Sequence, residues 1–505
     1  MPSTRILRRL TAIGSGLGAL VLALAVTPAT ASTPHAIRHR AIPVTHVIEI
    51  MLENHTFDDL FGNFPGANGI PVGTTFANPA SPGISTNRVA SLVAPANEGD
   101  VQGGLNNSRS AELTMMDRRS GGGYGMDGYT LFPGEGVSSI TTFSPETDPN
   151  LQYLARRFEL ADENFQPAIA PTLPNVLYAL AATSHGNLTN TVPVSGPAWS
   201  TIFDELSAAH RTWRIYPGVP SAVFRGTVWT KLLPSGSTTN LTSTSQFFTD
   251  IVRGELPDFS FVRPGVGYSE EPPEDVGEGD AWLGQLVSAV AHSRYWRSTA
   301  IFVTYDEGGG FYDHASPPVV RSSFGYGTRT PMVIVSPWVR SGIDAAETTN
   351  VSVLAFLQHL FVLAPLNALD ARQNDLFGAF NFHRHPLAPP KLPVLPAETI
   401  GFYGSSTLAD IGTPAPGQPL TIDLQQNTPG LALDTGATGH VTLTLTPPPG
   451  VPAPPDFPSG LELVAGKGRL TITFPHPGYY RIYASGPDAS LGWVTVDVGV
   501  DANTP

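Results

Sequence analysis

The sequence of 505 residues contains no cysteine, and this absence excludes several kinds of chemistry. Disulfide bonds, a thiolate nucleophile and a cysteine-ligated metal cannot occur. The fold must be stabilised by the packing of its core, with help where needed from a metal bound through other ligands. Charged residues are also scarce, at 14% of the chain, whereas 51 glycines and 49 prolines indicate many turns and loops.

Basic residues are fewer than acidic ones. The chain has 28 Lys and Arg residues against 42 Asp and Glu residues, for a formal net charge of −14. An acidic protein does not attract the phosphates of nucleic acid or an anionic membrane surface. We therefore expect no nucleic-acid partner and at most peripheral contact with a membrane.

The first residues have the features of an export signal. Arg5, Arg8 and Arg9 precede an apolar run from Leu10 to Val26, and a small-x-small cleavage site follows at Ala29-Thr30-Ala31. Cleavage would remove three arginines and no acid, and would change the formal charge from −14 to −17. We expect a signal peptide at residues 1–31 and a secreted or cell-envelope-associated protein. The Sec and twin-arginine routes both stay open, and an uncleaved anchor is the alternative.

Strand-like and helix-like segments alternate through most of the chain. Apolar β-branched runs predict strands at 44–52, 159–162, 212–216, 259–263, 299–304 and 331–336. Helices are predicted at 150–158, 176–183, 200–210, 246–255, 280–293 and 351–362. This alternation is typical of an α/β fold with a mainly parallel sheet and helices on both faces.

The pattern changes after a proline-rich segment at residues 383–396, which predicts a stiff linker. Beyond it, apolar residues alternate with period two and are separated by Pro and Gly turns, as at 441–446, 470–474 and 494–498. We expect an accessory part with a structural or surface-binding role there: a small antiparallel, sandwich-like β domain at 397–505, after a catalytic domain at 32–382.

The strongest chemical motif follows the predicted strand 299–304. Asp306 and Glu307 come first, then three glycines, then Asp313 and His314. Acids just beyond a buried strand lie where open α/β sheets bind ligands, and glycine lets the backbone approach a ligand closely. Neighbouring carboxylates repel each other unless a proton or cation lies between them, so a divalent metal is predicted. A solvated acidic turn is the alternative.

Three more oxygen donors are predicted at similar positions. Glu53 and Asn54 follow the predicted strand 44–52, and their oxygens suit Mg²⁺ or Ca²⁺. Thr172 comes just before the predicted helix 176–183, where backbone N–H groups favour a phosphate. A helix cap for Glu53-Asn54 and a simple turn for Thr172 are the alternatives.

These groups together predict a metal-assisted hydrolase. A divalent ion (Ca²⁺, Mg²⁺, Mn²⁺ or Zn²⁺) would activate the Thr172 hydroxyl as a nucleophile and offset charge on a phosphoryl group. His314 would protonate the leaving oxygen, unless it is only a hydrogen-bonded core residue. The predicted ligands are Glu53, Asn54, Thr172, Asp306 and Glu307.

Five segments resemble one known family in their order. They are ENHTFDDLFG (53–62), APTLPN (170–175), LPDFSFVRPG (256–265), TYDEGGGFYDHASPP (304–318) and TRTPMVIVSPWVRSG (328–342). The chain is similar to bacterial phosphoesterases that include phosphatidylcholine-type phospholipases C and related acid phosphatases. The resemblance implies an alkaline-phosphatase-like α/β fold, metal binding at Glu53, Asn54, Asp306 and Glu307, and Thr172 as the nucleophile.

The chain departs from the family where histidines are usual. Glu271 stands at the histidine of a common Asp-Glu-His-Pro-Pro run, and the segments 105–108 and 349–351 also lack an expected histidine. These changes leave the predicted metal and nucleophile residues in place and alter the expected contacts with substrate.

Two hypotheses follow. The first is a secreted, metal-dependent phosphoric ester hydrolase of phospholipase C or acid phosphatase type, with a phospholipid among its candidate substrates. The second is a catalytically weak homologue that binds a phosphorylated surface ligand. Replacing Thr172 by Ala separates them, because only the first requires its hydroxyl.

Overall fold

The computed structural model describes residues 42–499. Within this range the description omits residues 79–80, 89, 93–104, 121, 133–137, 192–198, 218–231, 235–237, 243, 266–267, 273, 275, 319–324, 393–398, 405–413, 428–432, 449 and 487–490. The predicted signal peptide lies outside the described residues, and so does part of the predicted linker.

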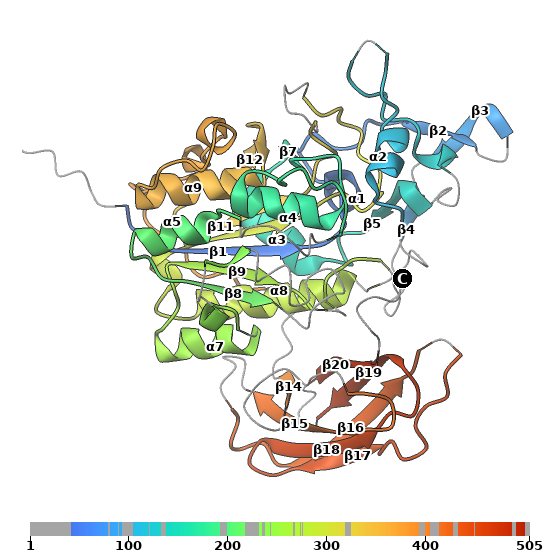
Figure 1. Cartoon of the computed structure of the whole chain (residues 1–505), viewed down its shortest axis with the longest axis vertical. Helices are drawn as coiled ribbons and strands as arrows, with labels where there is room; N and C mark the ends of the chain where they lie inside the picture. The colour runs from blue at the N-terminus through green and yellow to red at the C-terminus, as the bar shows by residue number, and fades with distance from the viewer. Residues whose placement is uncertain are drawn as a thin grey trace, which may run out of the picture. The chain divides into compact units, whose positions relative to one another are not determined.

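A seven-stranded sheet forms the centre of the α/β part (Figure 1). Its strands are, in spatial order, β12 (Gly342–Asp344), β6 (Glu159–Ala161), β11 (Met332–Val335), β10 (Thr299–Tyr305), β1 (His46–Leu52), β9 (Phe259–Arg263) and β8 (Trp213–Pro217). Only β11 runs antiparallel to its neighbours, β10 and β6. The prediction of a mainly parallel sheet is confirmed.

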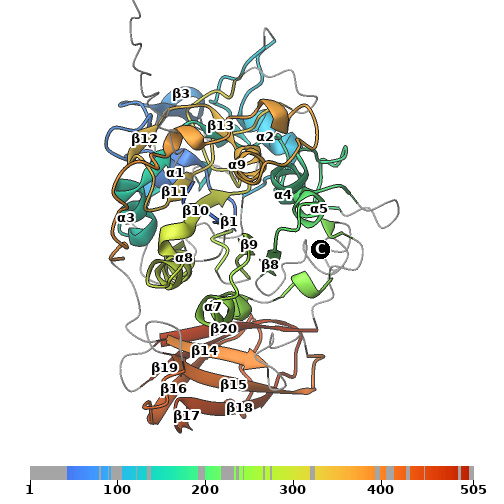
Figure 2. The ribbon, with the colours of Figure 1, turned by 90° about the vertical axis from the view of Figure 1, so that its left-hand side faces the viewer.

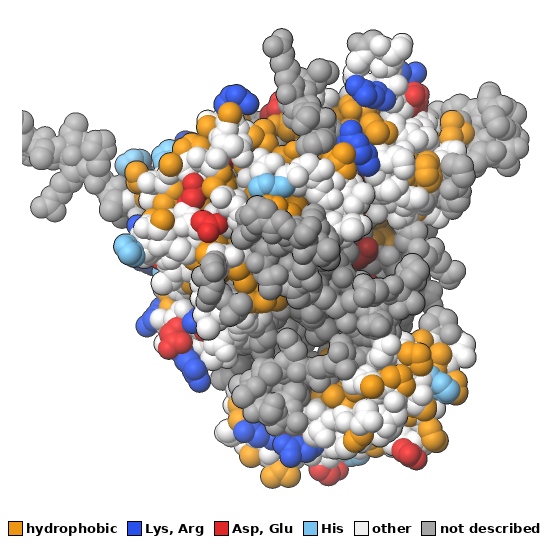
Figure 3. All heavy atoms as spheres, viewed as in Figure 1, with side chains coloured by type: hydrophobic (Ala, Val, Ile, Leu, Met, Phe, Trp, Pro, Cys, Tyr) orange, Lys and Arg blue, Asp and Glu red, His pale blue; other side chains and the backbone are white. Residues whose placement is uncertain are grey.

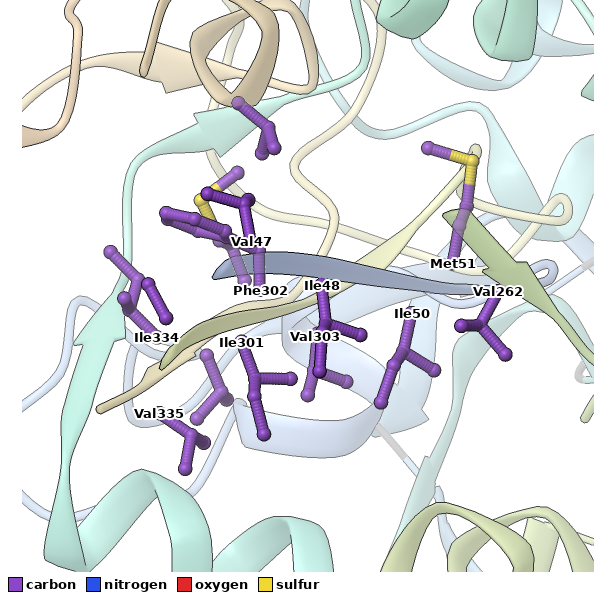
Figure 4. Close-up of a cluster of buried hydrophobic side chains, with 14 of the residues drawn as sticks. Val47, Ile48, Ile50, Met51, Val262, Ile301, Phe302, Val303, Ile334 and Val335 are labelled. Atoms are coloured by element: carbon purple, nitrogen blue, oxygen red, sulfur yellow. The ribbon is translucent and has the colours of Figure 1, made fainter. Parts of the chain in front are cut away.

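The two central strands, β1 and β10, are almost wholly buried. Their side chains alternate between the two faces of the sheet, with Ile48, Ile50 and Val303 on one face and Val47 and Phe302 on the other (Figure 4). Both faces therefore need apolar residues, which explains why these strands are continuous hydrophobic runs.

Helices cover both faces of the sheet. In Figures 1 and 2, α4 (Thr172–Ala181), α5 (Ile202–Ala208) and α9 (Val351–Phe361) lie on one face, and α3 (Pro149–Arg157), α7 (Thr244–Arg253) and α8 (Val276–Ala291) lie on the other. Helix α4 packs on α9, and α3 packs on α8. This arrangement agrees with the predicted layers.

Helix α4 begins earlier than predicted. It starts at Thr172 and not at residue 176, so Thr172 is the first helical residue and not a residue before the helix. Pro174 made the segment look like a turn in the sequence. A proline in the first turn removes only an N–H that has no partner within the helix, so the helix accommodates it.

Shorter elements connect these layers. They are α1 (Phe57–Phe61), α2 (Arg109–Met115), β2 (Thr75–Asn78) paired with β3 (Ser81–Arg88), β4 (Ala90–Leu92) paired with β5 (Thr141–Phe143), and β7 (Asn164–Phe165) paired with β13 (Thr348–Thr349).

The C-terminal part contains a second seven-stranded sheet. Its order is β17 (Gly460–Leu463), β16 (Gly439–Thr446), β19 (Gly478–Ser485), β20 (Leu491–Val498), β14 (Thr399–Gly404), β15 (Pro419–Asn427) and β18 (Lys467–Thr473). All neighbouring pairs are antiparallel except β14 and β20. The sheet has its own hydrophobic cluster, which includes Ile422, Val441 and Ile482. The predicted antiparallel β part is confirmed, whereas its boundaries and that of the linker stay predictions.

The described surface mixes side chains of both charges. On the face in Figure 3, acidic and basic side chains are interspersed with hydrophobic and uncharged polar ones. Among the helices of the described residues, none combines the length and the apolar character that a membrane span requires.

Candidate active site

The register of the two central strands brings the predicted acids together. Leu52 of β1 pairs with Tyr305 of β10, so the residues that follow both strands meet at one edge of the sheet. The Asp306 N–H donates to the Leu52 carbonyl (3.1 Å). Asp306 Oδ1 accepts from the backbone N–H groups of Asn54 (3.2 Å) and Glu307 (2.9 Å). The four predicted ligands outside α4 therefore lie in one buried cluster.

Arg263 completes this cluster, and the sequence analysis did not identify it. It is the last residue of β9, the neighbour of β1, and only 3% of it is exposed. Its Nη2 donates to Glu53 Oε1 and lies 3.8 Å from Asp306 Oδ2. The signal that could have identified it in the sequence is an arginine at the end of the predicted strand 259–263.

The acids of the cluster outnumber its one arginine, and their pKa values reflect this. Burial, together with the Glu53 carboxylate, raises the pKa of Asp306 to about 7, and Arg263 opposes the rise. Burial and the Asp306 carboxylate raise the pKa of Glu307 well above its usual range. Negative charge in this cluster is therefore disfavoured until a cation compensates it.

Two buried oxygens of the cluster have no hydrogen-bond partner among the described residues. They are Asn54 Oδ1 and Asp306 Oδ2, on side chains with 4% and 0% exposure respectively. Leaving such atoms unpaired is costly. Carboxylate and amide oxygens are the donors that hard divalent cations prefer, so the residues present fit a metal of this kind.

The glycines after Glu307 permit close packing against Asn54. Gly309 has φ +64°, and a Cβ there would lie 2.2 Å from the Asn54 carbonyl oxygen. Its N–H donates to Glu307 Oε2 (2.7 Å). A side chain at residue 309 would therefore force the two halves of the cluster apart.

Thr172 lies at the start of α4 and is 2% exposed. The loop before it is held by Asn175, whose Oδ1 accepts from the Ala168 N–H (3.0 Å) and whose Nδ2 donates to the Ala170 carbonyl (2.6 Å). Arg109 Nη1 donates to the Ile169 carbonyl (2.6 Å). The position of the Thr172 backbone is therefore set by side chains on both sides of the loop.

The segment around the start of α2 joins this loop to the acids. Asn107 Nδ2 donates to Glu307 Oε1 (2.6 Å), two residues before the arginine that holds Ile169. Gln166 makes a second link, because it accepts from the Gly308 N–H (3.0 Å) and donates to the Ala168 carbonyl (2.9 Å). The loop before Thr172 is thus linked to the acids through Asn107, Arg109 and Gln166. Among the hydrogen bonds of the described residues, none joins Thr172 to the acids directly.

A cavity of about 540 Å³ opens beside these groups. Apolar side chains line part of it, and Arg109 is its charged lining residue. Asn190, also in the lining, accepts from the Leu173 N–H (2.9 Å) at the start of α4. The full lining is Asn107, Ser108, Arg109, Ser110, Leu113, Pro171, Leu188, Thr189 and Asn190.

Comparison with known proteins decides the family, since the sequence profile of the Phosphoesterase family matches residues 44–364. The chain belongs to the phosphoesterase family. The predicted family and the prediction of a phosphoester hydrolase are both confirmed.

Among its relatives, this phosphoesterase is 25% identical to a non-specific phospholipase C6 of Arabidopsis thaliana over 358 residues, 65% of this chain and 68% of that protein. It is 26% identical to a non-hemolytic phospholipase C of Pseudomonas aeruginosa over 449 residues, 75% and 63% of the two chains. A crystal structure of an alkaline phosphatase superfamily protein from Vibrio parahaemolyticus aligns with TM-score 0.33 and 13% identity, over 60% of this chain and 75% of that one.

The positions at which this phosphoesterase lacks an expected histidine surround the acid cluster. Asn107 contacts Glu307, as described above. The Glu271 N–H donates to the hydroxyl of Ser269 (3.2 Å), whose carbonyl accepts from the Glu53 N–H (3.0 Å). Asn350 Nδ2 donates to the carbonyl of Tyr305 (2.8 Å), the residue before Asp306. The replacements therefore change the immediate surroundings of the acids.

His314 belongs to a different cluster of this phosphoesterase. Its Nδ1 lies 2.8 Å from Asp58 Oδ2, and its Nε2 lies 3.2 Å from Asn68 Oδ1. Asp58, Asp313 and His314 are close enough to offer three ligand atoms to a metal. However, the buried Arg329 already forms ion pairs with Asp58 (3.0 Å) and Asp313 (2.9 Å) and supplies the positive charge. The role of His314 as a proton donor stays a prediction.

Proposed function

We propose that this phosphoesterase is a secreted, metal-dependent phosphoric ester hydrolase with Thr172 as its nucleophile. The observation that carries the proposal is the pair of unpartnered buried oxygens, Asn54 Oδ1 and Asp306 Oδ2, in a cluster with surplus acid. Such a cluster is suited to bind a cation. The candidate export signal at the N-terminus supports secretion.

In this proposal Glu53, Asn54, Asp306 and Glu307 hold the metal, and Thr172 contributes its hydroxyl. The identity of the ion is open among Ca²⁺, Mg²⁺, Mn²⁺ and Zn²⁺. When bound, a divalent ion lowers the pKa of a hydroxyl beside it and offsets charge on a phosphoryl group.

Thr172 lies where a nucleophile can approach a phosphate. It begins α4, whose N-terminal N–H groups and dipole favour an anion. Its Oγ attacks phosphorus, the bond between phosphorus and the leaving oxygen breaks, and that oxygen takes up a proton, in this proposal from His314. Water then attacks the phosphothreonine and gives up a proton, which releases the phosphate product and restores the hydroxyl.

The names of the relatives make a phospholipid the first substrate class to test, because several are called phospholipases C. The cavity beside Thr172 combines Arg109 with the apolar side chains of Leu113, Pro171 and Leu188. A phosphate with an attached apolar alcohol suits such a lining. Phosphomonoesters stay a second substrate class.

The test uses residues 32–505, stripped of metal with a chelator. Hydrolysis of p-nitrophenyl phosphate and p-nitrophenyl phosphorylcholine is measured after each of the four metals is restored separately. We expect turnover with at least one metal, a loss of about 10³-fold or more in Thr172→Ala, and partial activity in Thr172→Ser, which keeps a hydroxyl.

Thermal unfolding of both variants serves as the control for folding. Absence of turnover with every metal in the wild-type protein would contradict the hydrolase and favour the alternative, binding of a phosphorylated ligand without hydrolysis. Equal activity of Thr172→Ala and wild type would exclude Thr172 as the nucleophile and leave the family assignment intact.

A further inference from the structure

The side chain of Gln166 lies between the loop that leads to Thr172 and the turn that follows Glu307. Gln166 comes directly after β7 and is completely buried. Its Oε1 accepts a hydrogen bond from the Gly308 N–H (3.0 Å), and its Nε2 donates to the Ala168 carbonyl (2.9 Å). A single side chain therefore joins the segment of the proposed nucleophile to the turn of the proposed metal ligands.

Both ends of this amide have further partners. The Oε1 atom also accepts from the Thr328 hydroxyl (3.0 Å), and Nε2 also donates to the buried Glu112 carboxyl of α2 (2.9 and 3.2 Å to its two oxygens). A Cβ at Gly327 would lie 2.3 Å from Gln166 Cδ, so glycine there leaves room for the side chain. A carboxylate or an apolar side chain at residue 166 would leave buried polar groups unpaired.

The loop before Thr172 is fixed relative to two different parts of the molecule. The Ala168 N–H donates to Asn175 Oδ1 (3.0 Å). Asn175 belongs to α4, so this contact fixes the loop relative to the helix that Thr172 begins. The contact between the Ala168 carbonyl and Gln166 instead fixes the loop relative to the turn at Gly308. Gln166 thus contributes to the separation between Thr172 and the acids.

We propose that Gln166 is a positioning residue for phosphoester hydrolysis, which holds the Thr172 loop in register with the Glu307 turn so that nucleophile and metal act on one phosphate. This inference rests on the proposed function and extends it. Reacting atoms must approach to about 3–3.5 Å, and a displacement of about 1 Å can lower the rate about 100-fold. Gln166 acts through its neighbours and touches neither the substrate nor the metal.

The first test replaces Gln166 by Met, which has a similar length and no hydrogen-bonding amide. Hydrolysis of p-nitrophenyl phosphate and p-nitrophenyl phosphorylcholine is measured on residues 32–505 with Ca²⁺, Mg²⁺, Mn²⁺ and Zn²⁺ supplied separately. We expect kcat to fall by about 10- to 100-fold while KM changes much less, because the substrate contacts are kept and the reacting groups are displaced.

The matched control is Gln152→Met. Gln152 is also a buried glutamine, 1% exposed, and its Nε2 donates to the Leu60 carbonyl (2.8 Å) and to Asp148 Oδ2 (3.1 Å). Among the hydrogen bonds of the described residues, it has none to the Thr172 loop or to the acids. We expect this variant to lose stability as Gln166→Met does, measured by thermal unfolding, and to keep the kcat of wild type.

A second test exchanges donor and acceptor between Gln166 and Glu112. Gln166→Glu places two carboxyl groups against each other, and adding Glu112→Gln restores a hydrogen bond between an amide and a carboxylate. We expect the double variant to recover about 10-fold of the kcat that Gln166→Glu loses, because the two residues are in contact and their effects are not additive. Equal kcat in the single and the double variant, both folded, would overturn the inference even if Gln166→Met does not fold.

Binding of inorganic phosphate, measured by titration calorimetry with each metal present, gives a result that does not depend on turnover. A phosphate held by both the start of α4 and the metal should bind about 10-fold more weakly to Gln166→Met, and equally well to Gln152→Met. Unchanged kcat and unchanged phosphate affinity in Gln166→Met would overturn the inference and leave the proposed function intact. Wild type without turnover would overturn the proposed function, and phosphate affinity alone would then decide the inference. Wild type with neither turnover nor phosphate binding would overturn both.

Discussion

Two buried arginines bind carboxylates in this protein, and the two clusters differ in how far their polar atoms are paired. Arg329 contacts Asp58 and Asp313 and also donates to the carbonyls of Asn68 and Asp162, both at 2.8 Å. Its donors are met on several sides and its carboxylates are held in turn by His314 and backbone N–H groups. The polar atoms of Asp58, Asp313 and Arg329 are therefore all paired, and the cluster is balanced in this sense, although burial raises the pKa of Asp313 to about 7 and the Asp58 carboxylate adds to the rise.

The Arg263 cluster lacks this balance. Glu53 and Asp306 face a single arginine with Glu307 beside them, and one Asp306 oxygen has no hydrogen-bond partner among the described residues. Burial of ionic groups is repaid only when their charges and hydrogen bonds are met. The comparison teaches that a balanced buried cluster holds the fold, whereas an unbalanced one at the end of two central strands is suited to bind a cation.

The largest expected effect comes from breaking the balanced cluster. Replacing Arg329 by Met leaves Asp58 and Asp313 buried without their cation. We expect the free energy of unfolding to fall by about 3–5 kcal/mol, the usual cost when one partner of a buried pair is removed. Urea denaturation of both proteins measures it.

The matched control is Arg119→Met. Arg119 also contacts two carboxylates, Asp117 and Asp127, but its side chain is 53% exposed. Ion pairs of this kind contribute about 0–1 kcal/mol. If the free energy of unfolding fell by a similar amount in the Arg119 and Arg329 variants, the cluster around Arg329 would not contribute the stability that its buried contacts predict.

A smaller and more specific effect is expected at Arg263. Without metal, Arg263→Met leaves Glu53 and Asp306 without their guanidinium, and we expect a loss of about 2–3 kcal/mol. A saturating cation should restore most of it, because a ligand at about 100 times its dissociation constant stabilises the folded state by about 2.7 kcal/mol. Unfolding with and without Ca²⁺ or Mn²⁺ measures the difference.

The two arginine variants together sharpen the comparison. Metal bound at the Arg263 cluster should stabilise Arg329→Met no more than it stabilises wild type; extra stabilisation of Arg329→Met would mean that an ion enters the Asp58, Asp313 and His314 group once Arg329 is gone. Rescue of neither variant would place the metal outside the Arg263 cluster.

Much of this arrangement was accessible from the sequence. The predicted strands at 44–52, 259–263 and 299–304 agree with β1, β9 and β10 within two residues, because strands buried on both faces are continuous apolar runs. Once those strands were placed in a parallel sheet, Glu53 and Asp306 followed at the same edge.

Other features could not be predicted because they depend on contacts between distant segments. The antiparallel direction of β11 does not appear in its composition, since a short buried strand has the same residues in either direction. The pairing of Arg263 with Glu53, and of Arg329 with Asp58, joins residues far apart in the chain. The start of α4 was predicted at residue 176 and lies at Thr172, because Pro174 is accommodated in the first turn and does not mark the helix boundary.

The smallest expected effect concerns pH and involves Glu49, a neighbour of the Arg263 cluster. Glu49 lies in β1, 1% exposed, and burial raises its pKa from 4.5 to about 8, while a Thr304 hydrogen bond and Arg263 lower it. Between these pH values the folded protein keeps a proton that the unfolded chain has lost. Stability contributed by this group therefore falls as pH rises from about 4.5 to about 8, and changes little above that range.

Replacing Glu49 by Gln removes this titration. The decrease in unfolding free energy between pH 5 and pH 8 should then be smaller than in wild type by about 2 kcal/mol, since each pKa unit corresponds to about 1.4 kcal/mol and part of the burial cost relaxes. Urea denaturation across this pH range measures it, with Glu462→Gln as the exposed control. If the unfolding free energies of wild type and Glu49→Gln changed with pH in parallel, the pKa of Glu49 would not be raised in the folded protein. The excess of buried acid near Arg263 would then be confined to the proposed metal ligands.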